Sequence, residues 1–175
     1  MRSVASAEPA ASAASPNIRT TGTLYVESSA LLRWLLEGDS ALQGTFGAYE
    51  RLFTSALTLI EVPRALARAR REQRLVALQS EDAQRRFAAF IRACTVAEIT
   101  KLVRDRAALE FPVEPVRSLD AIHLATVVVW TDTVGRMVIA SCDDRVRRNG
   151  RAMGYDVLPE PPSDGEATAA EVGEG

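Results

Sequence analysis

Short apolar runs recur along the middle of the chain and are separated by longer stretches in which apolar and polar residues mix. Because β-branched and aromatic residues are frequent in these runs, they predict strands at residues 23–27, 51–55, 94–97, 137–141 and 155–158. The intervening stretches predict helices at residues 30–36, 58–74, 81–91, 98–109, 119–130 and 145–153. Strands that alternate with helices favour an α/β sandwich with a central, mostly parallel sheet.

Local signals support several of these elements. The run MVIAS at residues 137–141 is typical of a parallel strand that is covered on both faces. Thr58, followed three residues later by Glu61, matches a capping box at the start of a long Arg-rich helix. Ser118 is a candidate cap for the helix that follows it. In a sheet of this class, functional groups collect at the carboxyl ends of the strands.

The chain has the size of one domain, with 175 residues of which 47% are hydrophobic. Residues 1–21 are rich in Ala and Ser, and we expect them to form a disordered N-terminal extension. Residues 160–175 hold five acids and no Lys or Arg, and we expect them to form an acidic, disordered tail. The folded domain is therefore predicted to span residues 22–159.

The composition favours a cytoplasmic protein without membrane attachment. No apolar stretch approaches the roughly 20 residues needed to cross a bilayer, and the N-terminus lacks the features of a secretory signal. Cys94 and Cys142 are too few for a disulfide framework and are not spaced as a zinc site. The formal charge is -2, but without the two flanks the domain carries a small positive excess, which is compatible with a phosphate-rich partner.

Four carboxylates stand out by their positions: Glu27 closes the first strand, Asp143 follows the penultimate strand, and Glu61 and Asp120 lie in first helical turns. All four can converge at one edge of the sheet, where carboxylates repel each other unless a cation or raised pKa values stabilise them. An all-oxygen set favours Mg²⁺ or Mn²⁺ over Zn²⁺. Three of the acids also have a local explanation, because first-turn acids stabilise helices and Asp143 or Asp144 can be an N-cap. By contrast, a charge that closes an apolar strand, as Glu27 does, is seldom there for packing.

Four segments resemble, in order and spacing, the motif blocks of VapC-type toxins in the PIN-domain ribonuclease family. They are LYVESSALLRWL at 24–35, SALTLIEVPRALAR at 55–68, SLDAIHLAT at 118–126 and ASCDDRV at 140–146. The resemblance covers residues 23–159 and implies a PIN-like α/β/α sandwich.

The resemblance also implies roles for individual residues. In the family, acids that match Glu61, Asp120 and Asp143 help to coordinate a Mg²⁺ or Mn²⁺ ion that cleaves RNA, and a hydroxyl that matches Ser29 lies beside the metal. Glu27 stands where the family has Asp, so its side chain is one methylene longer than that site expects. Displacements of about 1 Å can cost on the order of 100-fold in rate.

Two arginines and a histidine near these motifs are further candidates. Arg33 and Arg145 are candidates to bind RNA phosphates or a partner's acidic groups, and a solvated helix face is the alternative for each. His123, one turn after Asp120, is more often a buried structural histidine than a catalytic base.

The implied function is that of a metal-dependent endoribonuclease, the toxin of a type II toxin–antitoxin system. An RNA substrate, an antitoxin protein and a homodimer are the expected partners. One alternative is a PIN-like module, impaired by Glu27, that binds RNA or an antitoxin without efficient cleavage. Another is a DNA nuclease of related fold.

Overall fold

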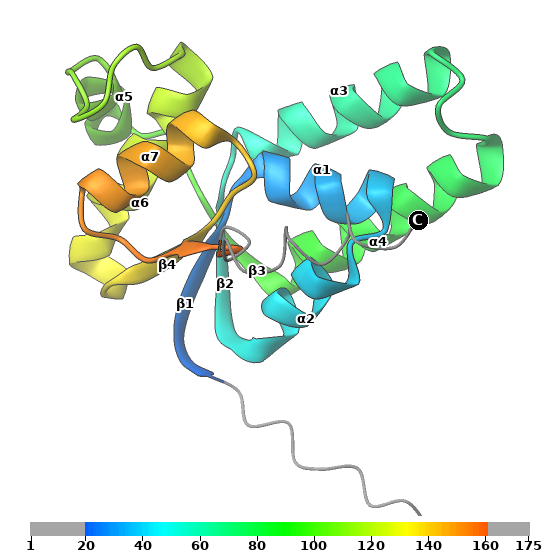
Figure 1. Ribbon diagram of the computed structural model, residues 1–175, viewed down its shortest axis with the longest axis horizontal. Coiled ribbons are helices and arrows are strands. Elements are labelled where there is room, and N and C mark those ends of the chain that lie inside the picture. Colours follow the sequence, from blue (N-terminus) through cyan, green and yellow to red (C-terminus); the bar gives the residue numbers. More distant parts are fainter. Residues whose placement is uncertain (1–19, 161–175) are drawn as a thin grey trace, which may run out of the picture.

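The computed structural model describes residues 20–160, which form a five-stranded parallel sheet between two layers of helices (Figure 1). The strands are β1 (Thr20–Val26), β2 (Tyr49–Ser55), β3 (Cys94–Ala97), β4 (Met137–Ala140) and β5 (Val157–Leu158). The helices are α1 (Ser28–Glu37), α2 (Ser40–Ala48), α3 (Thr58–Arg71), α4 (Ala77–Ala93), α5 (Lys101–Ala107), α6 (Ser118–Val134) and α7 (Asp144–Ala152). The predicted α/β/α sandwich with a parallel sheet is confirmed.

The strand order β3-β2-β1-β4-β5 places β1 at the centre of the sheet. Every neighbouring pair is parallel, and Val26 of β1 is in register with Ala140 of β4. The chain therefore leaves β1 and β4 at adjacent points of the same sheet edge. Because β2 lies on the other side of β1, the loops after all three strands meet there.

Side chains of β1 alternate between two hydrophobic cores. Leu24 and Val26 face the core that contains Leu31 and Trp34 of α1 and Leu66 of α3. Tyr25 faces the opposite core, which contains Leu124 of α6. In Figure 1, α1 to α4 accordingly lie on one side of the sheet and α5 to α7 on the other. Because both faces of the sheet are covered, both sets of alternating side chains are apolar, and the central strands therefore read as continuous apolar runs.

Helix α2 was not predicted, because its sequence lacks a clear apolar stripe and contains Gly44 and Gly47. Tertiary contacts stabilise it instead. Asp39 caps its N-terminus by accepting a hydrogen bond from the backbone N–H of Leu42, and the ring of Phe46 packs edge-on against Trp34 with centroids 5.7 Å apart.

Both predicted serine/threonine caps are wrong by one residue. Leu57 is the N-cap of α3 and Arg117 is the N-cap of α6, and neither has a capping side-chain hydrogen bond. Thr58 and Ser118 are the first residues of their helices. The hydroxyl of Thr58 instead meets Thr54 at 2.9 Å, so the Thr58 to Glu61 spacing reflects the site and not a capping box.

The other boundaries differ from the prediction by a few residues. Helix α4 starts at Ala77 and α6 runs on to Val134, and β1 begins at Thr20, before the predicted domain start. Of the predicted disordered extension and acidic tail, the structure describes only Thr20, Thr21 and Glu160. The rest of both segments lies outside the described residues. Among residues 20–160, no helix is both long and apolar enough to cross a membrane.

Candidate active site

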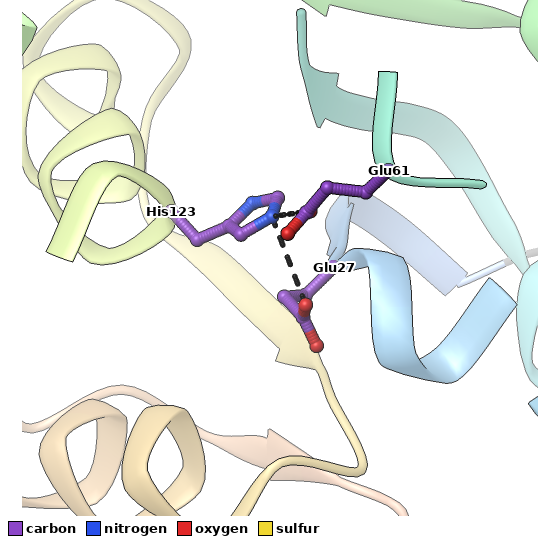
Figure 2. Close-up of side chains that lie close together, drawn as sticks. All are labelled: Glu27, Glu61 and His123. Carbon is purple, nitrogen blue, oxygen red and sulfur yellow. Dashed lines mark hydrogen bonds and ion pairs between the residues drawn. The ribbon is translucent and has the colours of Figure 1, made fainter. Parts of the chain in front are cut away.

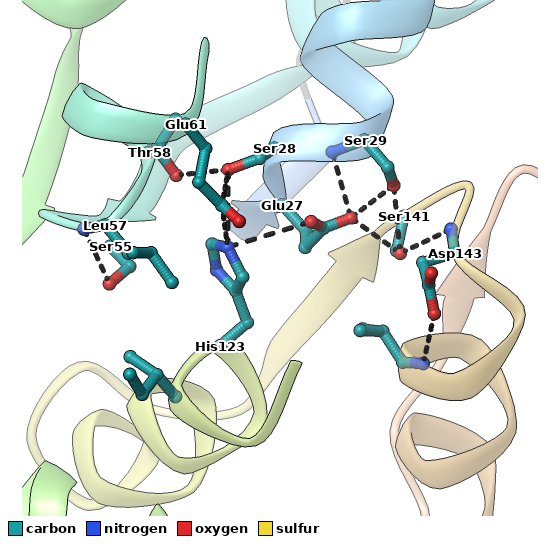
Figure 3. A network of polar contacts seen from close by, with 12 residues as sticks. Glu27, Ser28, Ser29, Ser55, Leu57, Thr58, Glu61, His123, Ser141 and Asp143 are labelled. Carbon is teal, nitrogen blue, oxygen red and sulfur yellow. Dashed lines mark hydrogen bonds and ion pairs between the residues drawn. The ribbon is translucent and has the colours of Figure 1, made fainter. Parts of the chain in front are cut away.

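The four predicted acids line one cavity of about 870 Å³ at the carboxyl edge of the sheet. Glu27 follows β1, Asp143 follows β4, and Glu61 and Asp120 project from the first turns of α3 and α6. The sheet order brings them together, because β4 and β2 flank β1 on either side. Figure 3 shows Glu27, Glu61 and Asp143 around this edge, with Ser28, Ser29 and Ser141 between them.

Glu27 is buried and its orientation is fixed by serines. Its Oε2 accepts hydrogen bonds from the backbone N–H of Ser29 at 3.0 Å and from the hydroxyl of Ser141 at 2.9 Å, and the Ser29 hydroxyl also donates to it. The side chain is thus the N-cap of α1. Its second oxygen, Oε1, lies 3.7 Å from Nε2 of His123. One carboxylate oxygen is therefore held by the protein, and the other turns toward the interior of the site.

Glu61 is held by two neighbours (Figures 2 and 3). Its Oε2 accepts a hydrogen bond from Ser28 Oγ at 2.6 Å and lies 2.8 Å from Nε2 of His123. Burial by itself would raise the pKa of Glu61, but the hydrogen bonds from His123 and Ser28 and the charge of His123 lower that pKa overall. The arrangement therefore favours the ionised carboxylate, which is the form that binds a metal.

His123 is buried, at 1% exposure, between Tyr25 and the two glutamates. Its Nδ1 lies 2.7 Å from the hydroxyl of Tyr25, and its Nε2 faces Glu61. Burial would lower the pKa of His123, but the hydrogen bond to Glu61 and the charges of Glu27, Glu61 and Asp120 raise it. With Nε2 2.8 Å from Oε2 of Glu61 and Nδ1 held by Tyr25, the geometry suits a residue that orients this carboxylate.

One oxygen of Asp120, Oδ2, is buried without a hydrogen-bond partner among the described residues, as are Thr23 Oγ1 and Trp130 Nε1. Burial, together with the charges of Asp143 and Glu27, raises the pKa of Asp120. Buried polar atoms normally have partners, and because this one is a carboxylate oxygen in the cavity of the other acids, a cation would supply the partner.

Asp143 is both a helix cap and a member of the acid cluster. Its Oδ1 accepts hydrogen bonds from the backbone N–H groups of Arg145 at 2.8 Å and Val146 at 3.2 Å, at the start of α7. The same side chain lines the cavity. Asp144, the first residue of α7, is not among the residues that line it. The N-cap role considered for Asp143 is therefore real and coexists with its place in the site.

These residues fit a hard divalent cation. Ligand atoms from Glu27, Glu61 and His123 lie within 4.8 Å of one another, and Asp120 adds the unpartnered oxygen. Carboxylate oxygens are the ligands that Mg²⁺ and Mn²⁺ prefer. Glu27, Glu61, Asp120 and Asp143 are therefore the residues that could hold the ion.

The three predicted substrate-binding residues are placed differently from one another. Ser29 lines the cavity. Arg33 does not, but its Nε lies 2.9 Å from Oδ2 of Asp39 and its side chain also reaches Cys142, the residue before Asp143. Arg145 is also absent from the cavity lining, but its guanidinium lies 4.0 Å from Oδ2 of Asp143. Ser29 therefore lies in the cavity, while Arg33 and Arg145 lie at its margin on either side of the Cys142–Asp143 segment.

Sequence reasoning missed several polar residues of the site. Ser28 and Ser141 hold Glu61 and Glu27, and their only signal was a position beside the predicted acids. Arg64, Arg68 and Arg71 of α3 also line the cavity. Their spacing of four and three residues, which places side chains on one helix face, could have revealed them.

Comparisons with known proteins show the family of the chain. The PIN domain family matches residues 24–152. Ribonuclease VapC35 of Mycobacterium tuberculosis (strain ATCC 25618 / H37Rv) is 32% identical over 140 residues, which cover 77% of this chain and 95% of that protein. Ribonuclease VapC45 of strain CDC 1551 / Oshkosh is 29% identical over 138 residues, covering 78% and 94%.

A solved structure shares the fold. VapBC2 from Rickettsia felis, crystallised with a DNA fragment from its promoter, superposes with a TM-score of 0.56. The alignment covers 77% of this chain and 96% of that one at 6% identity. This likeness concerns the fold alone.

Proposed function

This chain belongs to the PIN domain family and, within it, to the VapC ribonucleases, and on that premise we propose that it is a metal-dependent endoribonuclease, the toxin of a toxin–antitoxin pair. The ion that we propose is Mg²⁺ or Mn²⁺. The observation that carries the proposal is one cavity lined by Glu27, Glu61, Asp120 and Asp143, in which a buried oxygen of Asp120 has no protein partner among the described residues.

A divalent ion in such a site polarises a phosphoryl oxygen and lowers the pKa of a bound water. The residues of the chain supply the orientation. Ser28 and His123 fix Glu61, while Ser29 and Ser141 fix Glu27. Because hydrogen bonds hold these carboxylates before the substrate arrives, little reorganisation is needed during the reaction.

The longer side chain of Glu27 has a specific place in this arrangement. Its Oε2 accepts three hydrogen bonds from Ser29 and Ser141, while Oε1 points toward His123 and Glu61. The extra methylene is therefore accommodated by a serine cradle, which supports Glu27 as a working ligand and not as the cause of an inactive module.

The proposal extends to partners and location. The matched structure from Rickettsia felis is described as VapBC2 bound to promoter DNA, which supports an antitoxin protein as a partner of this chain. We further propose a homodimer that acts on RNA in the cytoplasm, with Ser29 and Arg145 near the substrate phosphate because both lie beside the acids.

The test is cleavage of a mixed tRNA and rRNA pool by the purified wild type, with Mg²⁺ or Mn²⁺ and with EDTA. Asp120→Asn, which removes one anionic oxygen, is expected to lower the rate by more than about 100-fold, since even loss of a residue that supports a metal ligand costs about 10–100-fold. Asp132→Asn, at an exposed position of the same helix, is the matched control and should cleave like the wild type.

Glu27→Asp separates the active enzyme from the impaired module. If the serine cradle makes Glu27 a working ligand, the wild type cleaves RNA and Glu27→Asp gains no more than a few-fold. A silent wild type with an active Glu27→Asp would show an impaired nuclease. RNA binding without cleavage by either protein would contradict the enzymatic proposal.

A further inference from the structure

Three arginines form a ridge on the α3 wall of the acid cavity. Arg64, Arg68 and Arg71 line it together with the four acids, and all three are exposed. At about 100° per residue, they fall within about 60° of one another around the helix, whereas Arg70 lies at least about 100° from each. The ridge is thus a single charged stripe that faces the cavity.

The ridge has no internal charge partner within residues 20–160. Arg33, Arg74 and Arg85 each make an ion pair with a carboxylate, but no such pair involves Arg64, Arg68 or Arg71 in the part of the chain that the structure describes. Unpaired guanidinium groups that flank a cavity are available to an anionic ligand, and their fork of N–H donors matches phosphate oxygens.

The acids alone would repel a polyanionic substrate. Four carboxylates repel a phosphate, and one divalent ion offsets only two of their charges. The three arginines add three positive charges to the same cavity. Attraction along α3 therefore compensates the repulsion that remains near the acids.

The ridge also has a direction. It starts at Arg64, one turn after Glu61, and ends at Arg71, the last residue of α3. It spans about 10 Å along the helix axis, which is long enough for the three guanidinium groups to contact more than one phosphate of a strand. Figure 1 shows α3 running away from the sheet and from α6, so the ridge leads outward from the acids.

We propose that Arg64, Arg68 and Arg71 form a phosphate-binding subsite that holds the RNA strand on one side of the scissile bond. The inference rests on the proposed ribonuclease function for its substrate class and adds the surface that recognises the RNA backbone. Backbone contacts position a nucleic acid without reading its sequence. The subsite therefore contributes affinity for RNA of any sequence.

The test is the salt dependence of RNA binding in EDTA, where cleavage does not interfere. Fluorescence anisotropy of a labelled oligouridylate is measured with the full-length wild type and with R64Q/R68Q/R71Q at several salt concentrations. Each phosphate contact contributes about 0.7 to the slope of log affinity against log salt for single strands. The triple variant should lose about two units of slope, which corresponds to about 100-fold in affinity at about 0.1 M salt.

Matched variants keep the result specific. Arg70→Gln removes a charge from the same helix outside the cavity and should bind RNA like the wild type. The triple Arg→Lys variant retains the charges and should keep most of the slope, because Lys binds phosphate as a point charge. Unchanged melting temperatures exclude misfolding, since all substitutions are at exposed positions.

The outcomes separate this inference from the function on which it rests. The subsite would be rejected if the triple Gln variant kept the wild-type affinity and slope. It would also be rejected if Arg70→Gln lost as much affinity as the triple variant, or if the wild type did not bind RNA. A ridge effect on binding in a protein that cleaves no RNA would leave the subsite standing and reject the ribonuclease. A cleaving wild type with no ridge effect would reject the subsite alone.

Discussion

Asp120 is the residue at which the requirements of folding and of function oppose each other. One of its oxygens is buried without a partner among the described residues, and burial with the nearby charges of Asp143 and Glu27 raises the pKa of this carboxyl. A raised folded-state pKa means that the native state favours the protonated form, so ionisation at higher pH destabilises the fold. The protein tolerates this cost where a cation can bind.

Asp120→Asn is therefore expected to raise the melting temperature in EDTA at neutral pH. The contribution of a group with a raised folded pKa is fully favourable below its unfolded pKa and is lost as pH rises through the folded pKa. The advantage of the Asn variant should accordingly shrink as the pH falls toward the acidic range. Thermal melts across pH, with Asp132→Asn as the control, check this. A less stable Asp120→Asn protein at neutral pH would contradict it.

Tyr25 is predicted to influence metal binding from the opposite side of His123. Tyr25→Phe removes the hydroxyl 2.7 Å from Nδ1 of His123, so the imidazole that meets Glu61 loses its orientation. We expect a loss of about 1 kcal/mol in stability and about tenfold in Mn²⁺ affinity, measured by denaturant unfolding and by titration calorimetry.

Tyr155→Phe is the matched control, because it removes a hydroxyl that lies 3.0 Å from Thr131 Oγ1 outside the acid cluster. It should cost similar stability and leave Mn²⁺ affinity unchanged. If both variants affect Mn²⁺ binding equally, or neither does, His123 is not a positioning residue for Glu61.

Single residues also show what sequence could and could not predict about the site. The acids were identifiable by their conjunction at strand ends and in first helical turns, since an acid in a first turn is by itself explained by helix stability. The contacts that link Tyr25, His123 and Glu61 could not be predicted, because Tyr25 lies inside an apolar run and resembles any core aromatic residue. Its partner becomes evident only when α6 packs against β1.

At the scale of elements, α7 begins with a residue that serves two purposes. Asp143 caps the helix through Arg145 and Val146 and also lines the cavity. Asn caps about as well as Asp, whereas Ala costs about 1 kcal/mol at an N-cap. The two substitutions therefore separate the structural role of Asp143 from its chemical role.

Asp143→Asn is expected to keep stability within about 0.5 kcal/mol of the wild type and to lower RNA cleavage by more than about tenfold. Asp143→Ala should lose both stability and RNA cleavage. Urea unfolding and RNA cleavage by the same preparations measure the two effects. If the stable Asn variant cleaved RNA at the wild-type rate, Asp143 would have only the structural role of a helix cap.

The elements that sequence predicted best are those with strong local patterns. The continuous apolar strands β1, β2, β3 and β4 were found within three residues at each end, and β2 starts only two residues before its predicted position. Helix α2 was missed because the contact of Phe46 with Trp34, and not a pattern in its own sequence, holds it in place. Thr58 was misread as a cap because its hydroxyl serves the polar network around Ser28.

At the scale of the whole molecule, the site is a product of strand order. β1 lies at the centre, so the loops after β2, β1 and β4 open at one edge, and α6 approaches from the opposite layer. Local patterns indicate which segments are strands but not how they are ordered. The convergence of Glu27, Glu61, Asp120 and Asp143 therefore depended on the resemblance to VapC-type proteins and on the fold.

The central claim is that the acids of one cavity share a divalent cation, and the position of Mn²⁺ in a crystal tests it most directly. Crystals soaked in Mn²⁺ should give an anomalous peak at coordination distance, about 2.0–2.6 Å, from oxygens of Asp120 and at least one other of the four acids. Crystals of Asp120→Asn should lose the peak. A peak elsewhere on the chain, or none at saturating Mn²⁺, would contradict the account.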